Sequence, residues 1–547
     1  MVVQPHTKYR PLAPVALSDR QWPSQTLSDA PCWLSADLSD GNQALFEPMD
    51  RPRKLRLFRE LVRIGFREIE LGTPAVSQTD HELVRHLIDR DLIPRGVTPA
   101  LLTPLQPAAI RQTVASARGA RRVIVHLFNP VAPAWRELVL EQSVEQIVTA
   151  VREGVELLRE LTDAQPDTEW TLQYSPETFC QAELEVSLAV CAAAIEAWDA
   201  GPGRPMIVNL PATVEVAMPN VFADQVEWMH RHLPRRADLV LSVHPHNDRG
   251  TAVACAEQAL LAGAQRVEGC LFGNGERSGN LDLVTLALNL YTQGIWPGLD
   301  FSDLNAVARV AEENTGLRVP ARHPYAGDLV FTAFSGTHQE AIAKGLAAQD
   351  PEGPWRVPYL AIDPRDVGRS YGGMARVNAA SGKGGIAHVL ERDHGIAMPR
   401  RMRIEFGAVV QRLGSASEAD LDADEVWRLF QQTYEAPLLA GRLRHLSHEL
   451  YDVPGGQRIR WRLSDAGVIG ERSGRGSGPL AAAADALGMR VDYVQHSLGQ
   501  GDQARPRAVV EAALPGRSGP VFGVGMHEDL ATAEILALLC AHNRVLT

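Results

Sequence analysis

Cysteine is scarce in this chain of 547 residues, and its pattern excludes a disulfide framework. The six cysteines include no Cys-x-x-Cys pair, and they are too few to cross-link a chain of this length. We therefore expect all six to be reduced thiols: Cys32, Cys180, Cys191, Cys255, Cys270 and Cys540.

Long apolar segments are also missing. No run of about 18 uninterrupted apolar residues occurs, and residues 1–21 contain no apolar core followed by a cleavage site. These absences predict a protein with no membrane partner and a cytoplasmic location.

An excess of positive charge is the third absence. The formal net charge is −12, whereas a nucleic-acid-binding surface normally requires a basic excess or stripe. We expect no nucleic-acid partner. The 45% hydrophobic and 22% charged residues are typical of a globular chain, and the length suggests about two to four domains.

The first half alternates short apolar runs with segments of helical periodicity, such as residues 53–64, 141–161 and 251–262. Regular alternation of strand and helix favours a parallel sheet, and eight repeats over about 250 residues match a closed (β/α)8 TIM barrel. The expected strands are residues 32–38, 67–71, 96–102, 122–128, 169–174, 206–210, 238–243 and 266–272.

Polar side chains follow nearly every expected strand. In a (β/α)8 barrel the chemistry lies at the carboxyl ends of the strands, so these side chains are predicted to meet at one mouth. The alternative, that loops are simply polar, does not account for the types of residue that collect there. They are Asp37 and Asp40, His126 and Asn129, Glu177, Thr213, His244 and His246, and Asn274 and Glu276.

The segment His244-Pro245-His246-Asn247-Asp248 directly follows the seventh expected strand. Side chains two residues apart on an extended strand point the same way, so His244 and His246 are able to share one metal ion. Two unrelated loop histidines are the alternative. Asp248, two residues after His246, precedes an expected helix and is predicted to cap it; a supporting contact to the metal ligands is the alternative.

Beyond the barrel the pattern changes twice. Residues 304–313 and 337–346 are predicted helices, and a glycine-rich piece follows at 371–385. Near the end, alternating runs at 459–463, 489–496 and 508–514 and helices at 480–487 and 530–543 indicate a small α+β domain. We expect an N-terminal extension at 1–27, the barrel at 28–300, a helical accessory region at 301–445 and the α+β domain at 446–547.

Several motifs together resemble the 2-isopropylmalate synthases, although each alone is weak. The resemblance covers the barrel, the accessory region and, more faintly, the tail. Its motifs are Asp37-Leu38-Ser39-Asp40-Gly41-Asn42-Gln43-Ala44-Leu45, the histidine segment, Gly273-Asn274-Gly275-Glu276-Arg277-Ser278-Gly279-Asn280, Tyr174-Ser175-Pro176-Glu177, Leu210-Pro211-Ala212-Thr213, and the stretches 358–369 and 381–385.

This resemblance implies a condensation of acetyl-CoA with 3-methyl-2-oxobutanoate on a divalent metal, followed by hydrolysis of the thioester. The implied metal ligands are Asp40, His244, His246 and Asn280. A mixed nitrogen and oxygen donor set does not choose firmly among metals; the resemblance favours Mg2+, with Mn2+ or Zn2+ as alternatives.

The resemblance also assigns the remaining site residues. Glu177, His338 and Tyr371 are the implied catalytic residues, with His338 and Tyr371 entering the neighbouring subunit's site in a homodimer. His126, Asn209, Thr213 and Glu276 are the implied substrate-binding residues; a buried threonine that satisfies its own backbone is the alternative for Thr213. The last domain, expected to be regulatory, resembles a leucine-binding domain, so leucine is the expected effector.

Ser39 departs from the family pattern, in which an arginine precedes the metal-binding aspartate. Loss of such a fixed donor can reduce a rate by about two to three orders of magnitude. Three explanations of the missing arginine are open. Arg249 or Arg277 supplies the positive charge instead, the substrate differs from that of the family, or the chain is a weakened or non-catalytic paralogue. A homocitrate-type condensation and a metal-dependent aldolase or lyase are the alternative enzyme activities.

Overall fold

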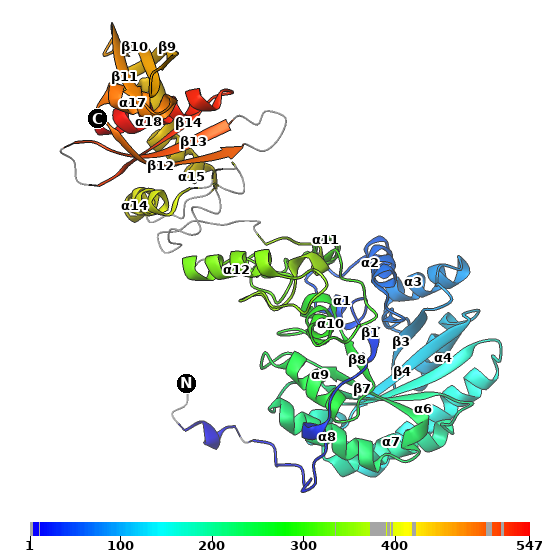
Figure 1. Cartoon of the computed structure of the whole chain (residues 1–547). Helices are drawn as coiled ribbons and strands as arrows, with labels where there is room; N and C mark the ends of the chain where they lie inside the picture. The colour runs from blue at the N-terminus through cyan, green and yellow to red at the C-terminus, as the bar shows by residue number, and fades with distance from the viewer. Residues whose placement is uncertain are drawn as a thin grey trace. The chain divides into compact units, whose positions relative to one another are not determined.

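The computed structural model describes residues 4–9, 11–333, 335–371, 390, 394, 396, 398–417, 423–498, 506–515 and 519–546. The chain forms two compact units, one made of residues 1–330 and 364–369, the other of 331–363 and 370–547 (Figure 1). The predicted glycine-rich piece lies outside the described residues, apart from Tyr371.

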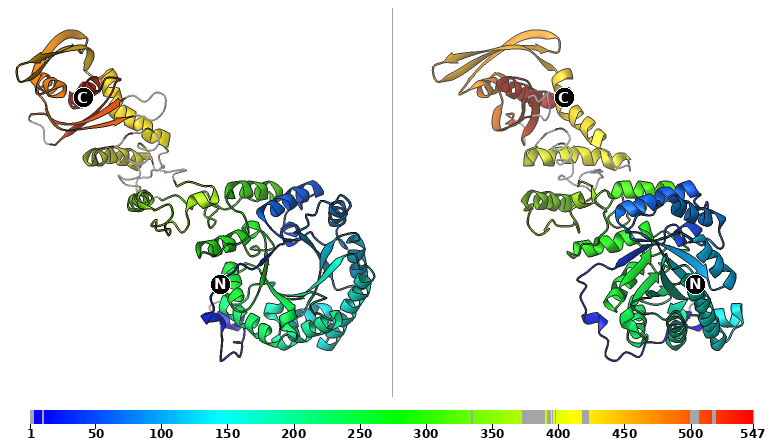
Figure 2. Two further views of the ribbon diagram at one scale, coloured as in Figure 1. Left: turned by 45° about the vertical axis from the view of Figure 1, so that its right-hand side comes forward. Right: turned by 90° about the vertical axis from the view of Figure 1, so that its right-hand side faces the viewer.

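The first unit is a closed barrel of eight parallel strands in sequential order, as predicted (Figure 2). The barrel closes where β1 pairs in parallel with β8. The strands are β1 Cys32–Ser35, β2 Glu68–Glu70, β3 Thr98–Pro104, β4 Arg122–Pro130, β5 Glu169–Glu177, β6 Met206–Ala212, β7 Leu239–Pro245 and β8 Arg266–Gly269.

The helices between the strands form the outer ring of the barrel (Figure 2). Their ends are encoded locally: the Asp50 side chain accepts a hydrogen bond from Arg53 N at the start of α2, and a Ser143–Gln146 capping box begins α6. The helices are α2 Arg51–Ile64, α3 Gln78–Asp89, α4 Pro107–Ser116, α6 Val144–Asp163, α7 Leu184–Trp198, α8 Pro219–His232, α9 Ala252–Leu261 and α10 Leu283–Thr292.

The eighth strand is shorter than expected. Residues 266–272 were predicted to be extended, but β8 ends at Gly269 and a 3-10 turn follows at Leu271–Gly273. Phe272 adopts a left-handed backbone with φ of 55°. The chain therefore bends across the barrel mouth here.

The N-terminal extension is anchored on α8. Arg20 pairs with Asp224 at 2.7 Å, and the Trp22 indole donates to the same carboxylate at 2.9 Å. The backbone N–H groups of Gln21 and Trp22 donate to Glu227. Two buried carboxylates of α8 thus gain donors from the extension.

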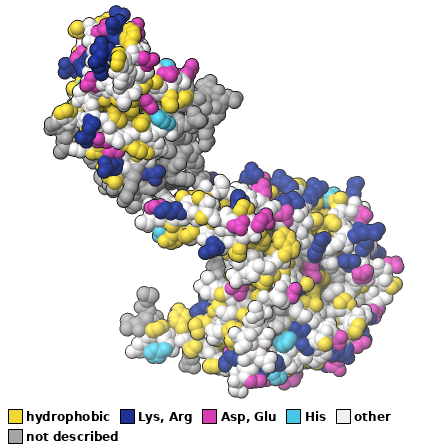
Figure 3. All heavy atoms as spheres, in the orientation of Figure 1, with side chains coloured by type: hydrophobic (Ala, Val, Ile, Leu, Met, Phe, Trp, Pro, Cys, Tyr) yellow, Lys and Arg dark blue, Asp and Glu magenta, His cyan; other side chains and the backbone are white. Residues whose placement is uncertain are grey.

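On the face seen in Figure 3, acidic and basic side chains are interspersed over the barrel unit. Within the described part of the chain, no helix is both long and apolar enough to cross a membrane.

The predicted accessory helices are present as α11 Leu304–Thr315 in the first unit and α12 Gly336–Ala348 in the second. The second unit continues with α14 Arg400–Ser417, α15 Ala423–Phe430 and α16 Ala436–Ala440. Phe406, Phe430 and Tyr434 pack in one buried cluster with residues of the C-terminal sheet.

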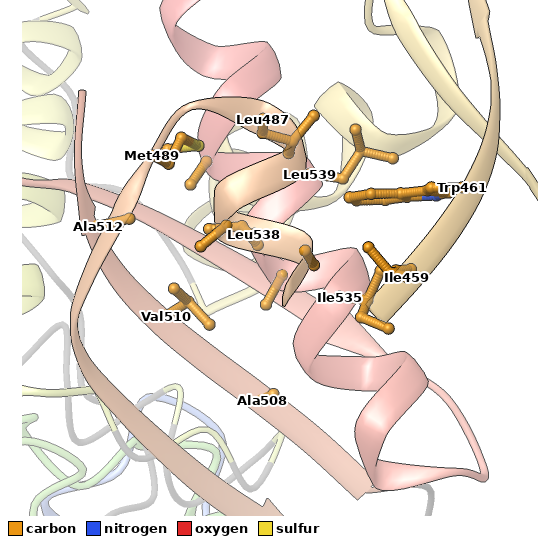
Figure 4. Packing of buried hydrophobic residues seen from close by; sticks show 14 of the residues in the cluster. Ile459, Trp461, Leu487, Met489, Ala508, Val510, Ala512, Ile535, Leu538 and Leu539 are labelled. Carbon is orange, nitrogen blue, oxygen red and sulfur yellow. The ribbon is translucent and has the colours of Figure 1, made fainter. Parts of the chain in front are cut away.

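The C-terminal domain repeats one arrangement twice: three antiparallel strands and a helix. The first set is β9 Leu443–Val453, β10 Gly456–Asp465, β11 Val468–Gly476 and α17 Pro479–Leu487. The second is β12 Arg490–Leu498, β13 Pro506–Ala513, β14 Val521–Met526 and α18 Leu530–Leu546. Trp461, Val510, Ile535 and Leu538 lie in its shared apolar core (Figure 4).

Candidate metal centre

Four predicted ligands come together at the carboxyl ends of three neighbouring strands. Asp40 begins the short helix α1 Asp40–Gln43 after β1, His244 lies on β7, and His246 follows that strand. Asn280 lies after β8 and forms an isolated β-bridge with His246. The ligand atoms of Asp40, His244 and His246 all lie within 4.8 Å of one another.

The donor atoms converge on the Asp40 carboxylate. Its Oδ2 lies 3.3 Å from His244 Nε2 and 3.4 Å from His246 Nε2. Asn280 Oδ1 lies 3.0 Å from His244 Nε2. A carboxylate, two imidazoles and an amide oxygen therefore surround one point, which is the donor set expected for a divalent cation.

Glu268 holds His244 in place from behind. His244 Nδ1 lies 2.8 Å from Glu268 Oε2, so the ring donates this N–H to the carboxylate and turns Nε2 toward Asp40. A metal-binding histidine commonly donates its other ring nitrogen to a carboxylate in this way. The arrangement fixes the tautomer that a metal ligand needs.

The electrostatics of the cluster favour positive charge. Burial alone would lower the pKa of His244, but hydrogen bonds to Asp40 and Glu268 raise it well above its ordinary value. Burial would raise the pKa of Asp40, yet its contacts with the two histidines hold it below the usual range. A proton and a metal ion compete for the same nitrogen, so the cluster fits a cation.

The pKa of His246 is shifted in the opposite direction to that of His244. Burial and the neighbouring His244 lower the pKa of His246 to about 4, so its imidazole is neutral near pH 7 and keeps a lone pair. Its Nδ1 is buried and has no hydrogen-bond partner in the described structure. A neutral ring of this kind is the form that binds metal.

The glycine-rich loop orients Asn280. The Asn280 amide donates to Asn274 O at 3.2 Å and to Cys270 Sγ at 3.4 Å, which leaves its oxygen toward His244. Gly279 has φ of +104°, and a Cβ there would lie 2.0 Å from Gly273 O. The glycine thus permits a tight loop around Asn280.

His126 and Asn209 belong to a buried polar layer inside the barrel. His126 Nδ1 lies 2.6 Å from Glu70, and its Nε2 lies 2.7 Å from Ser175 Oγ. Asn209 donates to the same hydroxyl at 2.9 Å. Both predicted substrate residues are therefore held by hydrogen bonds within the barrel.

Glu177 ends β5 and is partly buried. Burial, and to a lesser degree the negative charge of Asp40, raise the pKa of Glu177. A raised pKa brings a carboxylate closer to the range in which a general acid or base works at neutral pH.

Thr213, Arg277 and Asp248 join three loops at the mouth. Thr213 Oγ1 accepts a hydrogen bond at 2.9 Å from the backbone N–H of Thr178 in another loop, not from its own backbone. Arg277 pairs with Asp248 at 2.6 Å and donates to Thr213 O. Arg277 thus bonds to two neighbouring loops, through Asp248 and Thr213. The adjacent Glu276 is partly buried.

One local prediction is wrong. Asp248 does not cap α9, because its carboxylate accepts from Glu215 N at 2.8 Å and pairs with Arg277. Thr251 occupies the N-cap position, and the Glu215 side chain accepts from the backbone of Arg249 at the same helix start. A carboxylate from a neighbouring loop replaces the expected local cap.

His338 and Tyr371 belong to the second compact unit. His338 lies on α12 and stacks on Tyr359, with ring centroids 4.0 Å apart. Burial raises the pKa of Tyr371. Their predicted entry into a neighbouring subunit's site stays a prediction.

Glu70, Ser175 and Glu268 were missed as site residues. Glu70 and Glu268 are charged residues inside strands, at 3% and 1% exposure. Each lies in a short strand that carries a second charged residue, Glu68 or Arg266, so the sequence alone does not single out Glu70 or Glu268 as a site residue.

Comparison with known proteins covers the whole chain. A family model described as HMGL-like matches residues 30–311, the alpha-isopropylmalate synthase post-catalytic domain-like model matches 328–391, and the LeuA allosteric (dimerisation) domain model matches 420–546. A hydroxymethylglutaryl-CoA lyase structure from Pseudomonas aeruginosa aligns at a TM-score of 0.44 and 19% identity, over 54% of this chain and 97% of its own.

Curated relatives are much more similar. The 2-isopropylmalate synthase of Herbaspirillum seropedicae (strain SmR1) is 62% identical, over 100% of this chain and 98% of the relative. That of Ralstonia nicotianae (strain ATCC BAA-1114 / GMI1000) is 54% identical, over 100% of this chain and 96% of the relative. The chain therefore belongs to the 2-isopropylmalate synthase family.

Proposed function

We propose that this chain joins the acetyl group of acetyl-CoA to 3-methyl-2-oxobutanoate and hydrolyses the thioester, giving 2-isopropylmalate, the first committed step of leucine biosynthesis. The acetyl methyl group loses a proton and bonds to the ketone carbon, the ketone oxygen gains a proton, and water releases free CoA thiol. The observation that carries the proposal is the Asp40–His244–His246 cluster at the barrel mouth of a chain from this family.

Asp40, His244, His246 and Asn280 are the residues that would hold the cation. Their mixed nitrogen and oxygen donors suit Mg2+ or Mn2+, and Zn2+ is the remaining alternative. A divalent cation supplies Lewis acidity, which polarises the ketone of a chelating 2-oxo acid.

Glu177 is the proposed acid or base of the barrel. Its raised pKa follows from burial and from the nearby Asp40, and both favour a carboxylate that can take and return a proton. His338 and Tyr371 are proposed to complete the site from the partner of a homodimer. The match of residues 420–546 to an allosteric dimerisation domain supports this arrangement and a leucine effector.

His126, Asn209, Thr213 and Glu276 are the proposed substrate-binding residues. His126 and Asn209 lie at the floor, where Ser175 links them. Thr213 and Glu276 lie in loops of the mouth, and Arg277 binds the carbonyl oxygen of Thr213. These polar groups suit hydrogen bonds to the carboxylate and keto oxygens of a 2-oxo acid.

The test is thiol release from acetyl-CoA, followed with a chromogenic thiol reagent in the presence of Mg2+ or Mn2+. We expect release with 3-methyl-2-oxobutanoate and much less with 2-oxoglutarate, and we expect mass spectrometry to identify 2-isopropylmalate. Preference for 2-oxoglutarate would indicate a homocitrate-type enzyme. Absence of release with every short oxo acid would contradict the proposal and favour a non-catalytic paralogue.

A further inference from the structure

We propose that Ser39 and Glu268 are positioning residues at the two ends of one buried chain of hydrogen bonds, which couples the floor of the oxo-acid pocket to the metal-binding His244. The inference rests on the proposed function for its substrate. Its metal-binding part is measurable without catalysis.

The chain of hydrogen bonds begins next to the metal-binding carboxylate. Ser39, the residue before Asp40, donates through Oγ to Glu70 Oε1 at 2.6 Å. The other oxygen of Glu70 lies 2.6 Å from His126 Nδ1. The opposite ring nitrogen of His126 lies 2.7 Å from Ser175 Oγ.

The second half returns to the metal cluster. Asn209 Nδ2 donates to Ser175 Oγ at 2.9 Å and to Glu268 Oε2 at 3.2 Å. The same Glu268 oxygen lies 2.8 Å from His244 Nδ1. Because His244 Nε2 faces Asp40, the chain of contacts closes into a ring at the residue next to Ser39.

The six side chains that link Ser39 to Glu268 are all buried, and Ser39 is the most exposed of them at 7%. His244 and Asp40, which close the ring, are partly buried. Breaking one link therefore leaves a buried donor or acceptor without a partner, a larger perturbation than loss of a surface hydrogen bond. We expect the ring to hold its side chains in one arrangement.

The two carboxylates of the ring have different counter-charges. The negative charge of Glu268 is balanced by Arg266, whose Nη1 lies 2.5 Å from Glu268 Oε1. Glu70 has His126 as its sole ion-pair partner within 4.0 Å among the residues the structure describes. The Ser39 hydroxyl thus supplies the second donor to a carboxylate that has no Arg or Lys partner there.

This arrangement explains what the serine does in place of the family arginine. Its side chain turns inward to Glu70, so the residue acts on the pocket floor through Glu70 and His126. Loss at the Ser39 end should change oxo-acid binding. Loss at the Glu268 end should change metal binding, because Glu268 touches His244 directly.

Glu268→Gln tests the metal end. Glu68→Gln is the matched control, since Glu68 pairs with the same Arg266 at 2.6 Å but takes no part in the hydrogen bonds described for His244. Titration with Mn2+ by calorimetry should give about 10- to 100-fold weaker affinity for Glu268→Gln and an unchanged affinity for Glu68→Gln. Equal affinities in wild type and Glu268→Gln would overturn the metal end of the proposal.

Ser39→Ala tests the substrate end, with Ser39→Thr as the variant that keeps a hydroxyl. We expect Ser39→Ala to raise the KM for 3-methyl-2-oxobutanoate about tenfold, the scale of one lost buried hydrogen bond, with a smaller effect on kcat and on Mn2+ affinity. Ser39→Thr should restore most of the KM. A wild-type KM in Ser39→Ala, or a loss that threonine does not rescue, would overturn the role of the hydroxyl.

The two ends are linked if their effects are not additive. In the double variant Ser39→Ala/Glu268→Gln, the fold-change in KM should differ by at least about twofold from the product of the fold-changes in the two single variants. A purely multiplicative result would overturn the coupling. If wild type released no thiol at all, the proposed function would fail, whereas the Mn2+ titrations would still decide the role of Glu268.

Discussion

The interior of the barrel contains many polar and charged side chains, whereas the interior of the C-terminal domain is apolar. Inside the barrel, Glu70, His126, Gln173, Arg266 and Glu268 are all 5% exposed or less and satisfy one another through hydrogen bonds and ion pairs. The C-terminal core is formed by tryptophan, isoleucine, leucine and many alanines (Figure 4). Buried polar groups cost free energy unless they are paired. The barrel interior therefore gains less stability from apolar burial than the C-terminal core, but it provides groups that can bind a metal or a substrate.

This difference predicts which property of the protein a substitution should change in each region. In the barrel, changing a buried charge should alter metal or substrate binding, or leave a partner charge unpaired. In the C-terminal domain, changes of volume should matter most, because helices α17 and α18 pack directly on strand backbone. A Cβ at Gly523 would lie 2.0 Å from Ala537 O, and one at Gly474 would lie 2.3 Å from Ala482 O.

The largest stability effect is expected from Lys54→Met in the barrel. The Lys54 side chain is 1% exposed, and its ammonium group pairs with Asp80 and donates to Leu38 O at 2.6 Å. Removing it leaves the Asp80 carboxylate without its cation, which costs about 3–5 kcal/mol of the free energy of unfolding. Urea denaturation measures this loss. The double variant Lys54→Met/Asp80→Leu should recover part of it, and a single variant as stable as wild type would contradict the expectation.

A smaller effect is expected from Gly523→Ala in the C-terminal domain. The added methyl group would collide with the backbone of α18, and overpacking of this kind costs about 1–3 kcal/mol. Gly470→Ala, on β11, is the matched control, because its Cβ would meet nothing within 4 Å. Thermal unfolding should separate the two variants. Equal destabilisation would show that the close helix–strand approach is not the cause.

The effect that is smallest at neutral pH is a pH dependence in the C-terminal domain, which develops only as the solution is acidified. Burial, with the nearby His448 and His527, lowers the pKa of His445 to about 4, and its Nδ1 accepts the Trp461 indole N–H at 2.9 Å. The unfolded chain, with an ordinary pKa of about 6.5, binds the proton more readily, so stability falls as the pH drops from about 6.5 to 4. His445→Gln should flatten this dependence in denaturation curves. A slope identical to wild type would exclude His445 as its source.

Much of the barrel could be predicted from sequence because its strands are short apolar or alternating runs that recur regularly between helical segments. All eight expected strands are present. Strands β9, β11 and β14 were not predicted. In Val521–Met526 two glycines interrupt the apolar run, and they are explained only once α18 is seen to pack on them.

The metal cluster could also be predicted, because Asp40, His244, His246 and Asn280 lie in recognisable motifs at strand ends. The ring behind it could not. Glu70 and Glu268 become site residues only when closure of the barrel brings β2 and β8 to either side of β1. Asp248 failed as a cap because its partner, Arg277, comes from another loop.

The most direct test of the central claim is a Mn2+ titration of metal-free protein by calorimetry, with wild type, Asp40→Asn and Asp248→Asn compared. Asp248 is a nearby carboxylate outside the proposed ligand set, paired with Arg277. We predict one ion bound per wild-type chain, retention of binding in Asp248→Asn, and at least tenfold weaker binding in Asp40→Asn. Binding in Asp40→Asn as tight as in wild type would contradict the account.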